Sequence, residues 1–387
     1  MNTKHKTMQI GVIAYGLDRA PGGIGRYTQE LIQALQRRDV AITSLHAGKK
    51  PHILKNIKET LSGKQALRAV ELPGAGLLPG LLTLGQVEIG WLGKRKQLAL
   101  IHDPTGVMPL FLTGSRRVAT IHDVVPYIYP KTSTKLDKLI YHYWLPLAVR
   151  RLDAIITVSE QSKRDLIRYL PVKSEDIVVI PEAAGANYRL LNRKEIKPIL
   201  TRYNIDFPYI LYVGSLESRK NLPRLLEAYA RARQKVPQWK LVIVGARKWK
   251  FTPIFETVQR LQLEPHVHFT GYVEEEDLPA VYNGADLFVF PSLYEGFGLP
   301  VLEAMSCGTP VITSDCSSLP EVAGKAALLI DPYDVEAMGE AIQEVLLNPT
   351  LAASLRVKGL ARAKKFSWER TAQETIAVYE RVLAKTS

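Results

Sequence analysis

Residues 287–313 read LFVFPSLYEGFGLPVLEAMSCGTPVIT. The stretch opens and closes with short apolar runs, Leu287–Phe290 and Val311–Thr313, which are typical of buried parallel strands. A glycine-rich turn and an apolar segment of helical length lie between them. We therefore predict a strand–turn–helix–strand unit whose turn stands at the carboxyl end of a strand, where ligands of open α/β sheets bind.

Similar units extend in both directions along the chain. Other apolar runs predict strands at Gln9–Ala14, Ala41–Leu45, Val118–Ile121, Ala154–Val158, Tyr209–Val213 and Leu241–Val244. Helical patterns between several of them indicate an α/β fold with parallel sheets, and 387 residues suffice for two domains. The pattern becomes polar and aperiodic near Ala183–Pro208. We expect domains at 1–190 and 191–365, and a C-terminal helix, 366–387, that crosses back to the first domain.

One expected helix has a marked apolar face. Six apolar residues recur at helical spacing between positions 136 and 147: Leu136, Leu139, Ile140, Tyr143, Trp144 and Leu147. Because such a face usually covers a core, we interpret it as core packing.

The positive charge of the chain is concentrated in its first half. Residues 1–200 hold 30 Lys and Arg against 16 Asp and Glu, whereas residues 201–387 hold 21 against 22. This field indicates an anionic partner, either anionic lipid or a phosphate-bearing substrate, and an incidental basic surface is the alternative. Since no helix-turn-helix, zinc module or aromatic RNA-binding signature occurs, we expect no nucleic acid partner.

The sequence predicts no transmembrane helix. Its longest uncharged apolar stretch, Leu72–Gly85, is too short to span a bilayer and contains Gly and Pro. With the basic clusters of the first half, this stretch supports the hypothesis that the first domain lies on an anionic membrane surface. The clusters are Lys49-Lys50, Lys94-Arg95-Lys96, Arg116-Arg117 and Arg150-Arg151. The two cysteines and the polar N-terminus favour a cytoplasmic protein, peripheral at most on the inner face of the membrane.

Two turns that follow predicted strands suit anions. Residues 21–27 read PGGIGRY, and Gly23 and Gly25 would let a ligand approach the helix N-terminus that follows. The spacing of a dinucleotide-binding fingerprint is absent there. In the second turn, VGSLESRKN, Gly214 precedes Arg219 and Lys220, a fork and a point charge that suit a diphosphate. A solvated basic turn is the alternative reading.

Two carboxylates lie eight residues apart around the turn of residues 287–313. Glu295 stands in the turn and Glu303 in the expected helix. A carboxylate accepts hydrogen bonds from paired hydroxyls, so each suits a sugar or a ribose. The backbone N–H groups of Gly296–Leu299 open a helix, where phosphate and sugar hydroxyls can be held. A capped helix with two surface glutamates is the alternative.

Two His-Asp pairs, His102-Asp103 and His122-Asp123, end apolar strands. Strand ends of a parallel sheet point to the ligand edge, so we predict His122 as an active-site residue and interpret His102 as structural. The adjacent acid would suit a metal, but a third ligand is missing from the pattern, and we predict no metal site.

With these elements in this order, the sequence resembles the family-four retaining glycosyltransferases of the GT-B fold, in which two Rossmann-like domains face each other across a cleft. It is most similar to bacterial enzymes of lipopolysaccharide or exopolysaccharide synthesis, many of them mannosyltransferases. The segments that carry the resemblance are GGIGRYTQEL (22–31), TIHD (120–123), VGSLESRKNL (213–222), EGFGLPVLEAMSCGTPVI (295–312) and SLPEVAGKAALLIDPYDVEAM (318–338). The sequence departs from the family at Ser215, where some members have arginine, and at Pro181-Glu182-Ala183, where many have an asparagine–glycine pair.

The resemblance implies a nucleotide-diphosphate sugar as donor, with its ribose on Glu303 and its diphosphate on Arg219 and Lys220. Glu295 would contact the transferred sugar, and His122 would lie beside it. The implied catalytic residues are His122, Glu295, Arg219 and Lys220. The implied donor-binding residues are Gly23, Gly25, Gly214, Arg219, Lys220, Tyr272 near the base, Glu295, Gly296, Phe297, Gly298, Leu299 and Glu303.

The expected activity is transfer of a sugar, with retention, to a glycan or lipid-linked acceptor. Mannose from GDP-mannose is favoured by the resemblance alone. No D-x-D motif stands at a strand end, so we expect neither a metal nor a cofactor. A GT-B nucleotide-sugar epimerase and a non-catalytic nucleotide-sugar-binding paralogue are the alternatives; an acid/base set for the first is not identifiable, and the intact motifs argue against the second.

Overall fold

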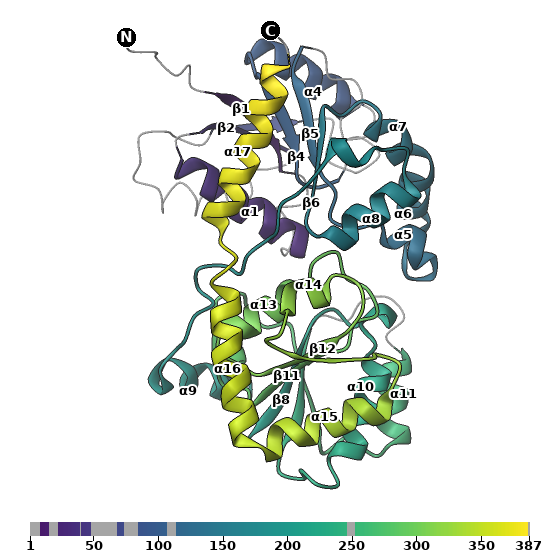
Figure 1. Ribbon diagram of the computed structural model, residues 1–387, viewed down its shortest axis with the longest axis vertical. Helices are drawn as coiled ribbons and strands as arrows, with labels where there is room; N and C mark the ends of the chain where they lie inside the picture. Colours follow the sequence, from purple (N-terminus) through teal and green to yellow (C-terminus); the bar gives the residue numbers. More distant parts are fainter. Residues whose placement is uncertain are drawn as a thin grey trace. The chain divides into compact units, whose positions relative to one another are not determined.

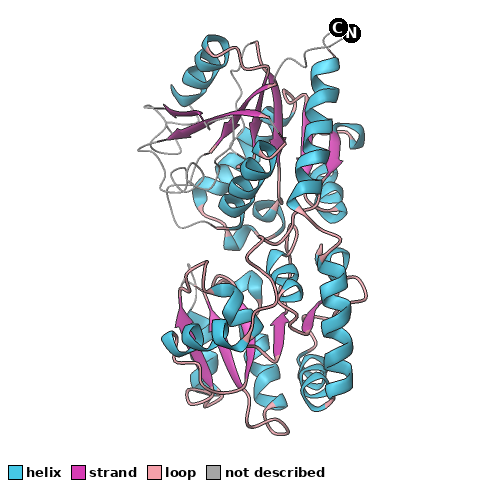
Figure 2. Cartoon of the chain, turned by 90° about the vertical axis from the view of Figure 1, so that its left-hand side faces the viewer, coloured by secondary structure: helices cyan, strands magenta, loops and turns pink. Residues whose placement is uncertain are grey.

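The computed structural model describes residues 8–14, 22–38, 40–47, 68–72, 84–106, 114–245 and 252–385 (Figure 1). Pro21, Lys49-Lys50 and most of Leu72–Gly85 lie outside the described residues. The chain divides into two units: Met1–Glu182 with Trp368–Ser387, and Ala183–Ser367. Each unit is a parallel β-sheet flanked by helices, as expected for the α/β class (Figure 2).

The sheet of the first unit has the strand order β3-β2-β1-β4-β5-β6-β7. This order reverses direction between β1 and β4, which is the switch point where ligands bind in open parallel sheets. The strands are β1 (Gln9–Ile13), β2 (Ala41–Ala47), β3 (Arg68–Leu72), β4 (Leu100–Asp103), β5 (Arg116–Thr120), β6 (Ala154–Thr157) and β7 (Ile177–Val179). The larger helices are α1 (Gly23–Gln36), α4 (Leu84–Arg95), α8 (Glu160–Tyr169) and α17 (Trp368–Ala384).

Helix α17 belongs to the first unit, although it is the last helix of the chain. It packs on α1 through aromatic and polar contacts. The ring of Trp368 lies edge-on to Tyr27 at 5.6 Å, and Thr371 donates a hydrogen bond to the carbonyl of Pro181 at 2.8 Å. These contacts connect the C-terminal helix to the sheet that α1 covers.

The sheet of the second unit has the order β10-β9-β8-β11-β12-β13 and again reverses between β8 and β11. Its strands are β8 (Tyr209–Val213), β9 (Lys240–Val244), β10 (Val267–Gly271), β11 (Leu287–Phe290), β12 (Val311–Ser314) and β13 (Leu328–Ile330). Its helices are α9 (Arg193–Arg202), α10 (Leu222–Ala232), α11 (Thr252–Arg260), α12 (Leu278–Asn283), α13 (Leu299–Ser306), α14 (Leu319–Ala323), α15 (Val335–Leu347) and α16 (Pro349–Ala363).

The buried apolar strands were predicted well, and the partly exposed ones were not. The bounds of β8 and β11 match the prediction, because all of their side chains are buried. Strand β10 was missed, since four of its five residues are partly or fully exposed. The polar segment expected to be aperiodic contains α9, which begins at a capping box formed by Asn192 and Glu195.

The expected burial of the apolar face at 136–147 is wrong for four of its six residues. The segment is α6 (Lys135–Leu139), the π-helical turn η3 (Ile140–Trp144) and α7 (Leu145–Val149). Leu136, Leu139, Tyr143 and Leu147 are exposed, whereas Leu145, Ala148 and Val149 join the core. The segment is apolar on two sides, and periodicity alone does not say which side faces the sheet.

Candidate functional site

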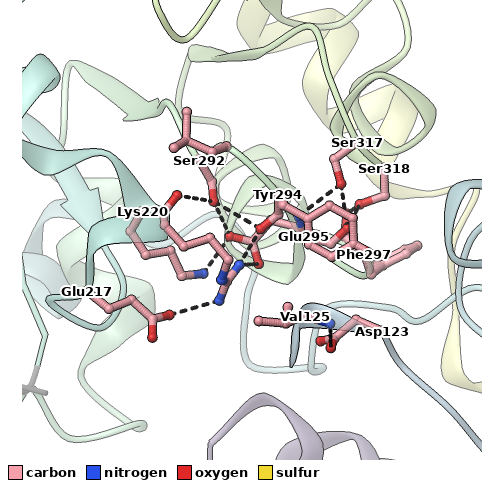
Figure 3. Close-up of polar contacts among 12 residues, drawn as sticks. Asp123, Val125, Glu217, Lys220, Ser292, Tyr294, Glu295, Phe297, Ser317 and Ser318 are labelled. Atoms are coloured by element: carbon pink, nitrogen blue, oxygen red, sulfur yellow. Dashed lines mark hydrogen bonds and ion pairs between the residues drawn. The ribbon is translucent and has the colours of Figure 1, made fainter. Parts of the chain in front are cut away.

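The candidate site of the second unit is centred on Glu295, in the loop between β11 and α13 (Figure 3). Its Oε1 accepts hydrogen bonds from Lys220 Nζ at 2.6 Å and from Ser292 Oγ at 2.5 Å. Its Oε2 forms an ion pair with Arg219 Nη1 at 3.1 Å. The structure thus brings together three of the predicted site residues, Glu295, Arg219 and Lys220, and Lys220 and Glu295 are 75 residues apart in the chain.

The ionisation of this cluster follows from burial and pairing. Burial opposes the charge of Glu295, but Arg219, Lys220 and the hydrogen bonds from Lys220 and Ser292 outweigh it and lower the pKa to about 2. Burial lowers the pKa of Lys220, and the nearby Glu295 partly opposes that effect. The Glu295 carboxylate is therefore ionised at neutral pH and binds Lys220 as a charged partner.

A second carboxylate, Glu217, completes the cluster, and the sequence reasoning missed it. Arg219 Nη2 donates to Glu217 Oε1 at 2.8 Å, and Ser215 Oγ donates to the same oxygen at 3.1 Å. Arg219 Nη1 also donates to the carbonyl of Tyr294. Two cations and two carboxylates balance each other, so this cluster is neutral rather than the cationic one that the sequence predicted.

Two serines after β12 hold the loop that carries Glu295. Ser317 Oγ accepts from the backbone N–H of Glu295 at 2.9 Å and lies 2.7 Å from its carbonyl. Ser318 Oγ lies 2.9 Å from the same carbonyl and 2.7 Å from the carbonyl of Phe297. Gly298 then takes φ +114°, which favours glycine, and α13 begins at Leu299. The loop geometry is thus set by groups of the neighbouring strand end.

The other predicted residues of this unit lie at the same edge of the sheet or in α13. Gly214 follows β8 and Tyr272 follows β10, and the carboxyl ends of parallel strands share one edge. Tyr272 is exposed. Glu303 is buried in α13, where the hydroxyl of Tyr282 donates to its Oε2 at 2.8 Å. The sequence motifs did not predict roles for Tyr282, Ser317 or Ser318, because these roles depend on contacts with residues distant in the sequence.

In the first unit, His122 lies between two acceptors. Its Nδ1 is 2.9 Å from Glu182 Oε1, and its Nε2 is 3.1 Å from the carbonyl oxygen of Pro104. The ring also meets Tyr27 edge-on at 4.6 Å. A carboxylate and a carbonyl only accept, so this arrangement favours the imidazole with a proton on both ring nitrogens.

The pKa of His122 agrees with that geometry. Burial lowers the pKa, but the hydrogen bond and charge of Glu182, the carbonyl of Pro104 and the charge of Asp123 outweigh burial and raise it. Glu182 was noted in the sequence only as a departure from the resembled family. The structure shows that this residue is the partner of a predicted catalytic histidine.

His102 has the opposite environment. Its Nδ1 is 2.6 Å from the hydroxyl of Tyr379 in α17, and its Nε2 is 2.9 Å from Thr120 Oγ1. Burial lowers its pKa to about 3, with a further contribution from His122. The ring is therefore neutral, and its bonds connect α17 to β4 and β5.

Gly23, a predicted donor-binding residue, lies at the start of α1. A Cβ added to Gly23 would meet nothing within 4 Å, so packing does not require glycine at the start of α1.

Over the part of the chain that the structure describes, no three His, Cys, Asp or Glu side chains are grouped to hold a metal. Nor is any helix there long and apolar enough to cross a membrane.

The fold matches solved glycosyltransferase structures over nearly the whole chain. Anabaena HepE in complex with UDP and glucose aligns with a TM-score of 0.78 at 18% identity, over 97% of this chain and 100% of that one. Sucrose-phosphate synthase from Thermosynechococcus elongatus aligns with a TM-score of 0.78 at 23% identity, over 98% and 100%. The fold is that of a GT-B glycosyltransferase.

Sequence comparison then gives the family. Residues 21–184 match Glycosyltransferase Family 4, and residues 193–362 match Glycosyl transferases group 1. O-antigen chain mannosyltransferase B of Escherichia coli is 34% identical over 92% of this chain and 96% of the relative. O-antigen chain mannosyltransferase RfbU of Salmonella typhimurium is 30% identical over 65% of each. The chain belongs to the family-four, group 1 glycosyltransferases, which are retaining hexosyltransferases.

The pairing of His122 predicts a measurable titration. By NMR of the imidazole, His122 should titrate above its ordinary pKa, and Glu182→Gln should lower that pKa because it removes the negative partner. Since pairing raises the folded-state pKa, its stabilisation is complete below the unfolded pKa, ~6.5, and is lost as pH rises through the folded pKa. The difference in unfolding free energy between wild type and Glu182→Gln should therefore shrink with rising pH.

Exposed Glu175 supplies the control for this comparison. It lies in the same unit and forms an ion pair with Lys173 at 3.7 Å, so Glu175→Gln should leave the His122 pKa unchanged. If the pKa of His122 did not change in Glu182→Gln, Glu182 would not be the cause of the raised pKa.

Proposed function

We propose that this glycosyltransferase transfers mannose from GDP-mannose to a glycan or lipid-linked acceptor in cell-surface polysaccharide synthesis. The observation that carries the donor side is the buried Arg219–Lys220–Glu295 cluster at the carboxyl edge of a parallel sheet. The choice of mannose is supported by the names of the E. coli and S. typhimurium relatives, both O-antigen chain mannosyltransferases.

In this proposal, Glu295 binds a hydroxyl of the transferred sugar. An ionised carboxylate offers about four lone-pair sites. Lys220 and Ser292 use two on Oε1, and Arg219 faces one on Oε2. Among the described residues, one site on Oε2 is then left for a sugar hydroxyl, which fits a positioning role better than covalent attack. A carboxylate with a pKa of about 2 and three donors is a weak nucleophile.

Arg219 and Lys220 stabilise the leaving diphosphate in the same proposal. As the bond between the anomeric carbon and the diphosphate oxygen breaks, negative charge grows on that oxygen, and fixed cations lower its energy. The acceptor oxygen forms the new bond from the same face, and its proton passes to the departing phosphate oxygen. Atoms and charge balance without a covalent enzyme intermediate, and the configuration is retained.

The remaining predicted residues have supporting roles. Glu303 would hold the ribose, Tyr272 would lie near the base, and His122 would present a positive charge beside the sugar. Backbone N–H groups of Gly296–Leu299 would bind phosphate and sugar oxygens at the start of α13. An epimerase or a non-catalytic paralogue has less support, because the chain belongs to a transferase family and retains the complete cluster.

Donor choice is tested by thermal shift and product analysis with GDP-mannose, UDP-glucose, UDP-N-acetylglucosamine and UDP-galactose. GDP-mannose should raise the melting temperature most, since ligand at 100 times its Kd adds about 2.7 kcal/mol to the free energy of unfolding. A mannosylated product should form with that donor alone. Turnover with a UDP-sugar and none with GDP-mannose would contradict the proposal that GDP-mannose is the donor.

The role of Lys220 is tested by Lys220→Ala and the similarly sized Lys220→Met. Loss of one charge-assisted contact should weaken donor or transition-state binding by about 1.5–3 kcal/mol, roughly 10- to 150-fold in kcat/KM. Exposed Lys358 in α16 provides the control, and Lys358→Ala should retain full activity. If folded Lys220→Met kept the donor affinity and turnover of the wild type, the proposed role of Lys220 in binding the diphosphate would be wrong.

The charge stabilisation proposed here needs no divalent ion. Activity should persist at full rate after treatment with EDTA and dialysis, because Arg219, Lys220 and helix N–H groups face the leaving group. The assay compares initial rates with EDTA, with Mg²⁺ and with Mn²⁺. Activity that disappears in EDTA and returns with either metal would contradict the proposal.

A further inference from the structure

The imidazole of His122 has a third contact besides its two hydrogen bonds. Glu182 and the carbonyl of Pro104 bind its two nitrogens, but a hydrogen bond tolerates some tilt of the ring. The ring of Tyr27 packs against the imidazole with centroids 4.6 Å apart and an angle of 88° between the planes. Such edge-to-face packing is a preferred arrangement of aromatic rings. Tyr27 therefore restricts the tilt that the hydrogen bonds leave open.

The hydroxyl of Tyr27 is fixed by a chain of hydrogen bonds that ends on the C-terminal helix α17. It lies 3.1 Å from Thr120 Oγ1, which lies 2.9 Å from His102 Nε2. The other ring nitrogen of His102 lies 2.6 Å from the hydroxyl of Tyr379, in α17. All four side chains are fully buried, so water does not compete for these bonds. Tyr27 is thus tied through β5 and β4 to α17.

Tyr27 meets α17 a second time, at Trp368, where the helix begins. The two rings lie edge-on with centroids 5.6 Å apart, and α17 packs along α1 (Figure 1). The indole N–H of Trp368 is buried and has no hydrogen-bond partner among the described residues. A buried N–H without a partner is costly, so the polar group of Trp368 does not hold the side chain in place. Its packing on Tyr27 accounts for the placement instead.

Glu182 and Trp368 stand where the chain leaves the first unit and where it returns to it. Glu182 contacts the imidazole of His122 directly, and Trp368 reaches it through the ring of Tyr27. Both chain connections of the first unit therefore end on residues that support one histidine.

We propose that Tyr27 and Trp368 are positioning residues, through which α17 sets the orientation of the His122 imidazole. This inference rests on the place of His122 beside the sugar in the proposed function, and it deepens that function. A misplacement of about 1 Å can cost about 100-fold in rate. Loss of the ring support should slow the chemical step more than it weakens donor binding. The groups proposed to hold the diphosphate, Arg219 and Lys220, belong to the second unit.

The first test compares two substitutions of Tyr27. Tyr27→Leu removes the ring and should lower kcat by ~10- to 100-fold, whereas KM for the donor stays near the wild-type value. Tyr27→Phe keeps the ring and should retain most of the wild-type kcat. Rates are measured well below each melting temperature, with GDP-mannose or with the UDP-sugar that supports turnover. A merely structural tyrosine would lower the melting temperature without this split between kcat and KM.

A double-variant comparison tests whether Trp368 acts through Tyr27. Trp368→Leu should lower kcat less than Tyr27→Leu does. Combining the two should cost no more than Tyr27→Leu alone, because Trp368 then has no ring left to support.

NMR of the imidazole gives a readout that needs no turnover. The ring of His122 lies beside the ring of Tyr27, so its proton resonances should shift in Tyr27→Leu and Trp368→Leu and change little in Tyr27→Phe. If a leucine variant does not fold, Thr120→Val serves in its place. It keeps the side-chain shape, removes the bond to the Tyr27 hydroxyl, and should shift the same resonances with a smaller loss of kcat.

Tyr229 supplies the matched control. It is fully buried in α10 of the second unit, where its hydroxyl lies within 3.1 Å of the carbonyls of Trp239 and His266. Tyr229→Leu should lower the melting temperature but leave kcat and the His122 resonances unchanged.

Two results would overturn the proposal. In the first, Tyr27→Leu would lose no more kcat than Tyr229→Leu does, with the His122 resonances unshifted. In the second, the losses of Tyr27→Leu and Trp368→Leu would multiply in the double variant. Full activity of His122→Ala would instead contradict the place of His122 in the proposed function, and the effect on kcat would fall with it.

Discussion

The site of the second unit depends on one buried ion pair, Lys220 with Glu295. Taking two charges out of water is costly, and their attraction repays that cost only with close geometry and further hydrogen bonds. Here the distance is 2.6 Å, and Ser292 and Arg219 supply the additional contacts to the carboxylate. The pair joins the loop after β8 to the loop after β11, and the serines after β12 hold the second loop. The ion pair thus connects two strand ends, and the serine hydrogen bonds connect the third to them.

The first unit uses the same principle with different residues. His122 at the end of β5 is held by Glu182, which follows β7, and by the carbonyl of Pro104, which follows β4. Neutral His102 connects β4 and β5 to Tyr379 of α17. Burial without a carboxylate partner keeps His102 neutral, whereas the Glu182 carboxylate raises the pKa of His122 and favours its cationic form. Two histidines 20 residues apart thus differ in environment, because only the ring of His122 is hydrogen-bonded to a carboxylate.

The sequence predicted the features that local pattern determines. Apolar runs such as Tyr209–Val213 predicted strands, and the glycine-rich stretch and apolar segment within residues 287–313 predicted a turn and a helix. Partners brought together by folding were missed: Glu217, Ser292 and Glu182 are ordinary polar residues until the fold places them beside a charge. The α6–α7 segment shows the remaining limit. Periodicity located its apolar side chains, but burial of Leu136 and Tyr143 was predicted wrongly because the sheet is covered by another side of that segment.

The neutrality of the cluster has a consequence for the proposed reaction. Arg219 and Lys220 are already balanced by Glu217 and Glu295, so the cluster does not attract a diphosphate as two unpaired cations would. Catalysis gains only from interactions that are stronger in the transition state than in the ground state. In the proposed function, charge grows on the leaving oxygen as the sugar bond breaks. N–H donors that the carboxylates hold in place stabilise that charge without reorganising. Glu217 and Glu295 would then serve catalysis by orienting the two cations, at the expense of tighter binding of the intact donor.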